Sequence, residues 1–597
     1  MSNPLTSLTV EILTGDAKVL LAFNLDKKDS KELAGFTIQC QPEGLDPYYL
    51  FNKLQFADPS IHAQVATEPA RSTVNSPIQK FRWLHVPGGI HQKKVVHGKY
   101  IYTVTPRYFE DGLLLPIDRG LSVVKETTLI PFVKDGIELG FTRGFTQSQA
   151  FISHFGSKAG FKPKNADLLF DPNVSAGVSS DGVAYTYLDE YKWSGFTART
   201  KIFDLIEGVL KDKTLFLDIF AYDLNEPDLL RHFLTLAGEG RIRLMLDDAA
   251  LHHNPDEPEP EDLFEAEFRK VDKKQANGES SIQRGNFKRY QHHKVMIVSK
   301  GENRTPVKVM GGSTNFSVTG MYVNSNHVII FNDPNIVKLF QEVYNQVWTD
   351  KLEIAPFLTS DLSTKEYPFN ISGMDLFVTF APHNETDALK NLNKITARLE
   401  AEQSSVLFAV MGSDPKTTGP VSPALIKLHQ RTDIFSAGIT DSKNDLMLYK
   451  PSSTTGIRVT GLPGKTILPP PFVAERSIDL GHQVHHKFIV CGFNTPDAVV
   501  WVGSSNLAQG GEMENGDNLI EIRDRDIATA FALEAIALVD HFQIRNRYPA
   551  PPKDKTAVQK PAKVKKAYNL YTEDKWAKSY FKSDDLHYVD RELFAVK

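Results

Sequence analysis

Two short stretches of this sequence decide how it folds: QHHKVMIV at residues 291–298 and VHHKFIV at residues 484–490. Each contains His-x-Lys and then continues into apolar residues, a composition typical of a buried β-strand. Polar segments follow in both copies: GGSTNFS at 311–317 and NSN at 324–326, then GSSNL at 503–507 and NGD at 515–517.

The spacing indicates that these stretches are copies of one unit. His292 and His485 are 193 residues apart, whereas Asn315 and Asn506 are 191 residues apart. A single His-x-Lys has little weight in a chain with 18 histidines, because chance supplies roughly one. Two copies with matched polar segments would arise by accident in well under about 1% of chains. We therefore expect an internal duplication.

The periodicity around the motifs predicts an α/β fold. Helical and strand-like segments alternate before the first motif, at 201–210, 215–222, 227–236 and 241–246. A helix at 388–402 and a strand at 406–411 repeat this order before the second motif. Such alternation is typical of βαβ units, in which helices flank parallel or mixed sheets.

The ends of the chain differ from this pattern. Alternating apolar residues near the N-terminus predict a small all-β sandwich of fibronectin or immunoglobulin type. Near the other end, PAPPKDKTAVQKPAKVKK from Pro549 predicts a solvated linker, and the aromatic residues after it a segment that docks on the body. An acidic, proline-bearing stretch from His253 predicts a surface loop. Four parts are expected: a β-sandwich at 1–135, α/β repeats at 136–355 and 356–548, and the linker with its docking segment at 549–597.

The two motifs resemble the signature of the phospholipase D superfamily, which is His-x-Lys, a later Gly-Ser-x-Asn and a further polar or acidic position. The resemblance covers roughly residues 140–550 and implies duplicated domains whose motifs face each other across a pseudo-twofold axis. A complete site within one chain would follow. The family also has an Asp five residues after the lysine, where this chain has Ser299 and Gly492. That departure weakens the transfer of the usual phospholipid specificity.

Phosphodiester chemistry explains why these residue types recur. Negative charge spreads over the non-bridging oxygens in the transition state, so fixed cations and amide donors stabilise it. One imidazole attacks phosphorus, and the other protonates the leaving oxygen. The expected catalytic residues are His292, Lys294, Asn315, His485, Lys487, Asn506 and Asp517, and the expected substrate-binding residues are Ser313, Ser504 and Asn326.

The resemblance also suggests how the two histidines divide the work. An acid after the second Gly-Ser-x-Asn is implied to orient the first motif's histidine, which makes His292 the nucleophile, held by Asp517. His485 is then the general acid, with Asn326 near it. The alternative is that Asp517 is only a loop residue in the acidic turn 512–517.

No metal ion or cofactor is expected to take part. Neighbouring histidines on a strand point to opposite faces, so His293 and His486 should point away from the site, and zinc would lack ligands. Acidic residues at strand ends offer another metal hypothesis, but solvated strand ends and turns explain them more simply: Asp218, Asp223, Asp247 and Asp248.

Composition sets the remaining limits. The chain has 597 residues, 41% of them hydrophobic, a formal net charge of −5 and two cysteines, Cys40 and Cys491. The size requires several domains, and the charge gives no basic footprint for nucleic acid. Neither a signal peptide nor an apolar span is evident, so a cytoplasmic location is expected.

Three functions remain open at this point. A phospholipase D-type enzyme acting on phospholipids is slightly favoured, with peripheral membrane contact as a corollary. A nuclease using the same phosphohistidine route is the second hypothesis, with Lys288–Tyr290 as the one basic hint beside the first motif. The third, a binding module on an inactive enzyme fold, conflicts with the intact His, Lys and Asn residues of both motifs.

Overall fold

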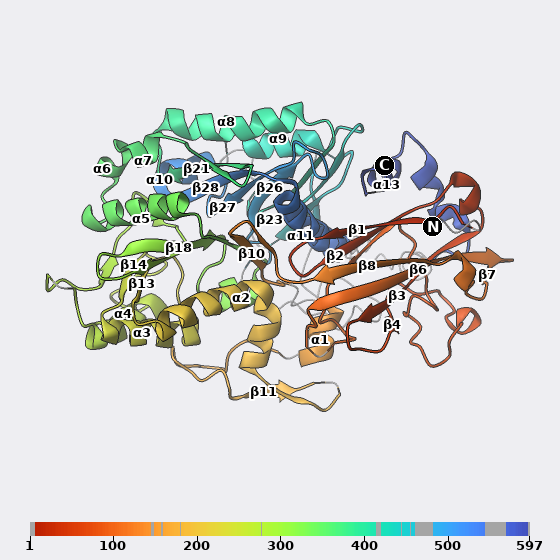
Figure 1. Cartoon of the computed structure of the whole chain (residues 1–597), viewed down its shortest axis with the longest axis horizontal. Coiled ribbons are helices and arrows are strands. Elements are labelled where there is room, and N and C mark those ends of the chain that lie inside the picture. The colour runs from red at the N-terminus through yellow and green to blue at the C-terminus, as the bar shows by residue number, and fades with distance from the viewer. Residues whose placement is uncertain are drawn as a thin grey trace, which may run out of the picture.

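The computed structural model describes residues 6–92, 94–144, 148–156, 159–179, 181–275, 277–412, 419–442, 445–453, 455–459, 482–543 and 569–594. The predicted linker from Pro549 to Lys566 lies outside these residues. Figure 1 shows two α/β layers stacked on each other, with a β-rich part beside them that contains the N-terminal strands.

The N-terminal part consists of two sheets that share one apolar core, which confirms the predicted β-sandwich. One sheet has the order β1-β2-β5: Thr9–Thr14, Val19–Asn24 and Arg82–His85. The other contains β3, β4, β6, β7 and β8: Leu33–Pro42, Tyr48–Tyr49, Gly98–Glu110, Leu113–Leu114 and Val123–Leu129. Apolar residues on alternate positions of both sheets, such as Leu21 and Ile38, fill the space between them.

The first α/β layer is built on an eight-stranded mixed sheet. Its order is β15-β14-β13-β17-β18-β19-β10-β9. The bounds in that order are Ile282–Arg284, Ile242–Leu246, Leu215–Ala221, Val295–Lys300, Thr305–Gly312, His327–Phe331, Ile137–Phe141 and Val133–Lys134. The strand that follows the first His-x-Lys, β17, therefore lies in the middle of the sheet, where its run of apolar residues is buried.

The second layer repeats this arrangement. Its path is β20-β21-β28-β27-β26-β22-β23-β24-β25, and the short strand β16 pairs with β28. The bounds are Tyr367–Ile371, Met374–Ala381, Asn515–Arg523, Val499–Gly503, Lys487–Cys491, Ser405–Val410, Phe435–Ser442, Asp445–Tyr449, Ile457–Val459 and, for β16, Tyr290–Gln291. The pairs β13/β14 and β22/β23 correspond to each other and are parallel, and the pairs β13/β17 and β22/β26 on their other sides are antiparallel. The α/β prediction of two similar sheets flanked by helices is confirmed.

Helices precede, connect and follow the central strands in the same order in both layers. They are α2, α3 and α5 in the first layer and α8, α9 and α11 in the second: Tyr187–Lys211, Pro227–Glu239, Pro334–Thr349, Glu385–Ala401, Val421–Leu428 and Arg525–Gln543. Figure 1 shows α5 and α11 between the two sheets, with α8 and α2 on opposite outer faces. The ring of Phe531 on α11 lies 5.1 Å from Phe141 of one sheet and 5.1 Å from Phe488 of the other. The two layers therefore share a core.

One predicted loop is partly a helix. The acidic stretch from His253 leads into α4, Pro260–Val271. Proline at the first helical position and a capping box between Glu259 and Asp262 start this helix, and Phe264 and Phe268 bury its apolar face. The loop interpretation was wrong here because it relied on charge and proline content and overlooked the spacing of the two phenylalanines. The other short elements are α1, β11, β12, α6, α7, α10 and α13: Gln149–Phe155, Ser175–Val178, Ala184–Thr186, Ile354–Leu358, Asp361–Thr364, Gln509–Glu514 and Leu586–Phe594.

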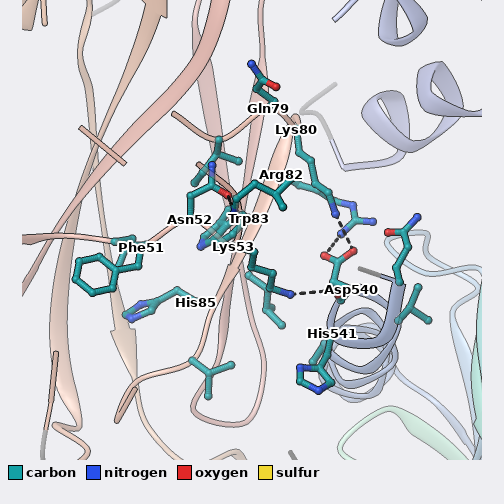
Figure 2. Close-up of a pocket in the computed structure, with 18 of the residues that line it drawn as sticks. Phe51, Asn52, Lys53, Gln79, Lys80, Arg82, Trp83, His85, Asp540 and His541 are labelled. Atoms are coloured by element: carbon teal, nitrogen blue, oxygen red, sulfur yellow. Dashed lines mark hydrogen bonds and ion pairs between the residues drawn. The ribbon is translucent and has the colours of Figure 1, made fainter. Parts of the chain in front are cut away.

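The β-sandwich contacts α11 of the second layer through ion pairs. Arg82 and Lys80 lie 2.8 Å and 3.2 Å from the carboxylate of Asp540, as Figure 2 shows. A cavity of about 880 Å³ runs along this contact, and the His and Lys side chains of the two motifs do not line it. The C-terminal segment packs on the sandwich here: Trp576 Nε1 donates a hydrogen bond to Leu33 O, and its ring contacts Phe81.

Among the helices that the structure describes, not one combines the length and the apolar character that crossing a bilayer requires.

Candidate active site

Each His-x-Lys motif is anchored by a backbone segment of the opposite layer. The amide of His292 donates to Gly516 O, and the amide of His485 donates to Ser325 O, each at 3.0 Å. Gly516 and Ser325 are themselves 191 residues apart, the same offset that separates Asn315 from Asn506. Strand β16, just before His292, pairs with the start of β28, and Val484 pairs in parallel with Ser325. The folding of the two copies against each other thus brings both motifs to their shared interface.

The histidine side chains cross this interface in the same way. His292 Nδ1 lies 2.8 Å from Asp517 Oδ1 of the second layer. His485 Nδ1 lies 3.0 Å from Asn326 Oδ1 and 3.1 Å from the carbonyl oxygen of Ser313, both of the first layer. Ionised carboxylates and carbonyl oxygens only accept hydrogen bonds, so both histidines carry a proton on Nδ1. Both therefore present Nε2 for chemistry.

The two lysines are buried cations without a carboxylate partner. Lys294 Nζ donates to His292 O at 2.6 Å and sits 4.6 Å from the ring centre of Tyr222. Lys487 Nζ donates to His485 O at 2.9 Å and lies 3.3 Å from His485 Nε2. Neither makes an ion pair with any residue in the described ranges. Burial lowers the pKa of Lys294 to about 7 and holds that of Lys487 well below its usual value, an effect to which the charge on Lys294 adds.

Burial and the two lysines together lower the pKa values of both histidines. Burial lowers the pKa of His292 to about 4, although Asp517 acts in the opposite direction. The pKa of His485 is well below its usual value because of burial and the charges on Lys487 and Lys294. Burial opposes ionisation of Asp517, yet His292 and Lys294 hold its pKa below the ordinary range. An anion bound between the lysines would raise both imidazole pKa values and so favour their protonated forms.

Two asparagine side chains remain available beside this centre. The amide oxygens of Asn315 and Asn506 are buried and accept no hydrogen bond from any residue that the structure describes. The two serines have other partners. Ser313 Oγ donates to Asn326 Oδ1 at 2.7 Å, and Ser504 Oγ accepts from the amide of Asn518 at 3.0 Å. Both serine hydroxyls therefore hydrogen-bond to other protein groups, namely Asn326 and Asn518.

The second histidine of each motif points away from the first, as strand alternation predicted. His293 packs on Phe220, and its Nδ1 accepts a hydrogen bond from Asn518 Nδ2 at 3.3 Å. His486 lies 3.2 Å from His327, Nδ1 to Nδ1. In the described part of the chain, His, Cys, Asp and Glu side chains form no group of three or more placed to hold a metal ion.

Sequence reasoning missed two positioning carboxylates. Asp247 Oδ1 accepts from the amide of Gln291 at 2.6 Å, and Asp441 Oδ2 accepts from the amide of Val484 at 3.0 Å. Each fixes the backbone just before a catalytic candidate. The interpretation of Asp247 as a solvated strand end was wrong, since it is fully buried. Its distance from Asp441, 194 residues, is close to the repeat offset and could have identified both.

Asp218 was also misread as a solvated residue. It is fully buried and pairs with Arg243 at 2.8 Å and with Arg304 at 2.7 Å. Asp223, whose pKa burial raises to about 6, accepts a hydrogen bond from Ser317 Oγ at 2.6 Å. Asp218 thus binds two arginines and Asp223 a serine of the first layer, contacts that the position of a residue at a strand end does not predict.

Residues 211–348 match the family described as cardiolipin synthase, PLD-like domain. This part of the chain is therefore a phospholipase D-like domain. The match covers the first motif and the strands of its sheet from β13 to β19. In this phospholipase D-like fold the family's missing Asp positions are occupied by Ser299, a buried hydroxyl without a partner among the described residues, and by Gly492, which turns the chain at a φ of 66°.

Solved structures give further matches to this chain. Polyphosphate kinase from Porphyromonas gingivalis is 13% identical with a TM-score of 0.35 and aligns over 63% of this chain and 53% of its own. Phosphatidylserine synthase from Haemophilus influenzae is 9% identical with a TM-score of 0.36, and the alignment covers 62% of this chain and 90% of the synthase. Nuc from Salmonella typhimurium, a phospholipase D family member, is 22% identical with a TM-score of 0.18, and the alignment covers 26% of this chain and 88% of Nuc. The chain thus spans about half of the length of the polyphosphate kinase. Among curated proteins no match is found.

Proposed function

We propose that this chain is a phosphodiesterase that works without a metal ion through a phosphohistidine intermediate on His292. One observation carries the proposal. The imidazoles of His292 and His485 are each held at Nδ1 by a residue of the opposite layer, beside two buried lysines that form no ion pair with any residue that the structure describes. We propose that the catalytic site is complete within one chain, because both layers contribute to both halves of it.

In the proposed first step, His292 Nε2 attacks phosphorus and the bond from phosphorus to the leaving oxygen breaks. His485, protonated on Nε2 once the anionic substrate has raised its pKa, gives that proton to the leaving oxygen. Asp517 stabilises the positive charge that develops on the His292 ring. Lys294 and Lys487 stabilise the non-bridging oxygens, and the amide groups of Asn315 and Asn506 add hydrogen bonds to them.

In the second step, a water molecule or an alcohol attacks the phosphohistidine. His485 Nε2 takes the proton from this nucleophile, the phosphorus–nitrogen bond breaks, and His292 returns to its neutral form. Water gives hydrolysis, and an alcohol gives transfer of the phosphoryl group. In this proposal the serines support the partners of the two histidines, since Ser313 Oγ hydrogen-bonds to Asn326 and Ser504 Oγ to Asp517.

A glycerophospholipid is the substrate class that we propose. The family that matches residues 211–348 carries the description cardiolipin synthase, and the net charge of −5 offers no general attraction for nucleic acid. Under this proposal the protein contacts a membrane surface only through its substrate.

The test is turnover in EDTA against three substrates: phospholipid vesicles, single- and double-stranded DNA, and a chromogenic phosphodiester. The wild-type protein should release headgroup from vesicles in EDTA, and the His292→Ala and His485→Ala variants should not. DNA cleavage without lipid turnover would replace the substrate class by a nuclease function. Loss of all turnover in EDTA would overturn the metal-free scheme, and a wild-type protein inert to every substrate would leave only a binding role.

A further inference from the structure

The two buried lysines of the site differ in the side chain that lies against each of them. The strand register shows that Tyr222 and Met411 occupy equivalent positions: each lies two residues beyond the one that pairs with the residue after the motif lysine. The ring centre of Tyr222 is 4.6 Å from Lys294 Nζ, and Met411 Sδ is 3.7 Å from Lys487 Nζ. One lysine thus faces an aromatic ring and the other a thioether.

Three neighbouring rings fix the ring of Tyr222 in place. Those of His292, His252 and Tyr290 lie 4.7, 4.5 and 5.5 Å from it, at interplanar angles of 74°, 71° and 70°. Burial raises the pKa of the Tyr222 phenol, so the ring is neutral. The face of a neutral aromatic ring is partially negative and attracts a cation most strongly where water is excluded. Lys294 is 1% exposed, so this condition is met.

The charges around the two lysines are also unequal. Asp517, Asp223 and Asp247 all favour the charged form of Lys294. At Lys487, Asp517 favours the charge, whereas the charge on Lys294 opposes it. The carboxylates and the aromatic ring therefore act in the same direction, towards a positive charge on Lys294.

The two imidazoles beside Lys294 do not compete for this charge. Burial lowers the pKa of His292 to about 4 and that of His293 to about 3, so both rings are neutral near pH 7. In the free protein the positive charge of the site therefore belongs to the lysines, and first to Lys294.

We propose that Tyr222 is a positioning residue whose ring face keeps Lys294 charged and in place in the free protein, so that Lys294 is the first group to bind an anionic phosphodiester. Lys487, beside the thioether of Met411, becomes fully charged once the negative charge of the substrate lies next to it. The inference rests on the proposed phosphodiesterase function, but the interaction between Tyr222 and Lys294 is measurable without any substrate.

The experiment weakens the aromatic face while keeping its shape. Tyr222 is replaced by phenylalanine and by phenylalanines that carry increasing numbers of fluorine atoms, which withdraw electron density from the ring face. NMR of lysine labelled with ¹³C at Cε follows the ionisation of Lys294, whose resonance is the one missing from Lys294→Met. Tyr222→Phe should leave the pKa of Lys294 unchanged, and the most fluorinated ring should lower it by about one pH unit.

The same fluorinated series at Tyr290 is the matched control. Tyr290 contacts Tyr222, but the cation over its own face is Arg289. Fluorination there should leave the pKa of Lys294 unchanged. A pKa that stays constant along the Tyr222 series, or that falls equally along the Tyr290 series, would overturn the proposal. Because this titration needs no turnover, it gives its answer even if the wild type cleaves no phosphodiester and the proposed function fails.

Activity gives a second readout on a phosphodiester whose leaving group is a nitrophenolate, which needs no proton from His485. For this nitrophenyl ester kcat/KM reports the ionisation of the free protein. If the pKa of Lys294 falls from about 7 by one unit, kcat/KM should fall about tenfold at pH 8 but only about twofold at pH 6. Equal losses at the two pH values would contradict the role of Tyr222 in keeping Lys294 charged.

Discussion

Asp517→Asn is the substitution that tests the assignment of the two histidines most sharply. Asp517 is 1% exposed and holds His292 Nδ1 at 2.8 Å, whereas His485 is held by the neutral amide of Asn326. The substitution therefore gives His292 the same kind of partner that His485 has, with almost no change in shape. What is lost is the negative charge beside a ring that becomes positive when it attacks phosphorus.

The expected loss follows from the strength of that contact. A hydrogen bond to a charged group contributes about 1.5–3 kcal/mol, and solvent does not screen this buried one. At about 1.4 kcal/mol per factor of ten, formation of the phosphoenzyme should slow about 10- to 150-fold.

Rapid quenching of the reaction with the nitrophenyl ester measures this step as the burst of released nitrophenolate. Asn326→Asp, the matched variant, should leave the burst rate within about threefold of the wild type. Its added charge lies beside His485 and not beside His292, the attacking residue. A wild-type burst in Asp517→Asn would refute the reasoning. A slow burst in Asn326→Asp with a normal one in Asp517→Asn would make His485 the nucleophile.

Three further outcomes are expected. Lys294→Met should lower kcat for the nitrophenyl ester about 10²- to 10³-fold, because a preorganised cation is lost, whereas Lys300→Met, at the exposed end of the same strand, should not change kcat. Asn506→Ala should lower kcat about tenfold or more with little change in thermal stability, since its amide oxygen has no partner to lose among the described residues. Acid should destabilise the protein between pH 6.5 and 4. The pKa values of the His293 and His327 rings lie near 3 in the folded protein, so in this range the unfolded chain binds more protons than the folded one. The free energy of unfolding should therefore fall by about 1.4 kcal/mol for each ring and each pH unit of acidification. Calorimetry on His327→Gln should show a shallower fall in Tm with decreasing pH.

The two His-x-Lys pairs could be identified from the sequence because they recur with matched polar segments. The resemblance to the phospholipase D superfamily implied that the motifs face each other, and the structure brings Asp517 to His292 and Asn326 to His485. The α/β order was equally clear, because long apolar strands and amphipathic helices alternate regularly around both motifs.

Other parts of the site depend on contacts that no local pattern encodes. In the sequence Asp247 is an ordinary acidic residue after a strand, and only the folded structure brings the amide of Gln291 to its carboxylate. The role of Ser313 was likewise set by its neighbour Asn326, which follows 13 residues later in the sequence and turns back to meet it.

The most direct measurement is the location of the covalent phosphate. The His485→Ala variant, incubated with the nitrophenyl ester and quenched at alkaline pH to protect phosphohistidine, is digested and its peptides are analysed by mass spectrometry. Our account predicts phosphate on His292 and no phosphopeptide from His292→Ala. Phosphate on His485 in the His292→Ala variant, or full turnover in the wild type without any phosphohistidine, would contradict this account.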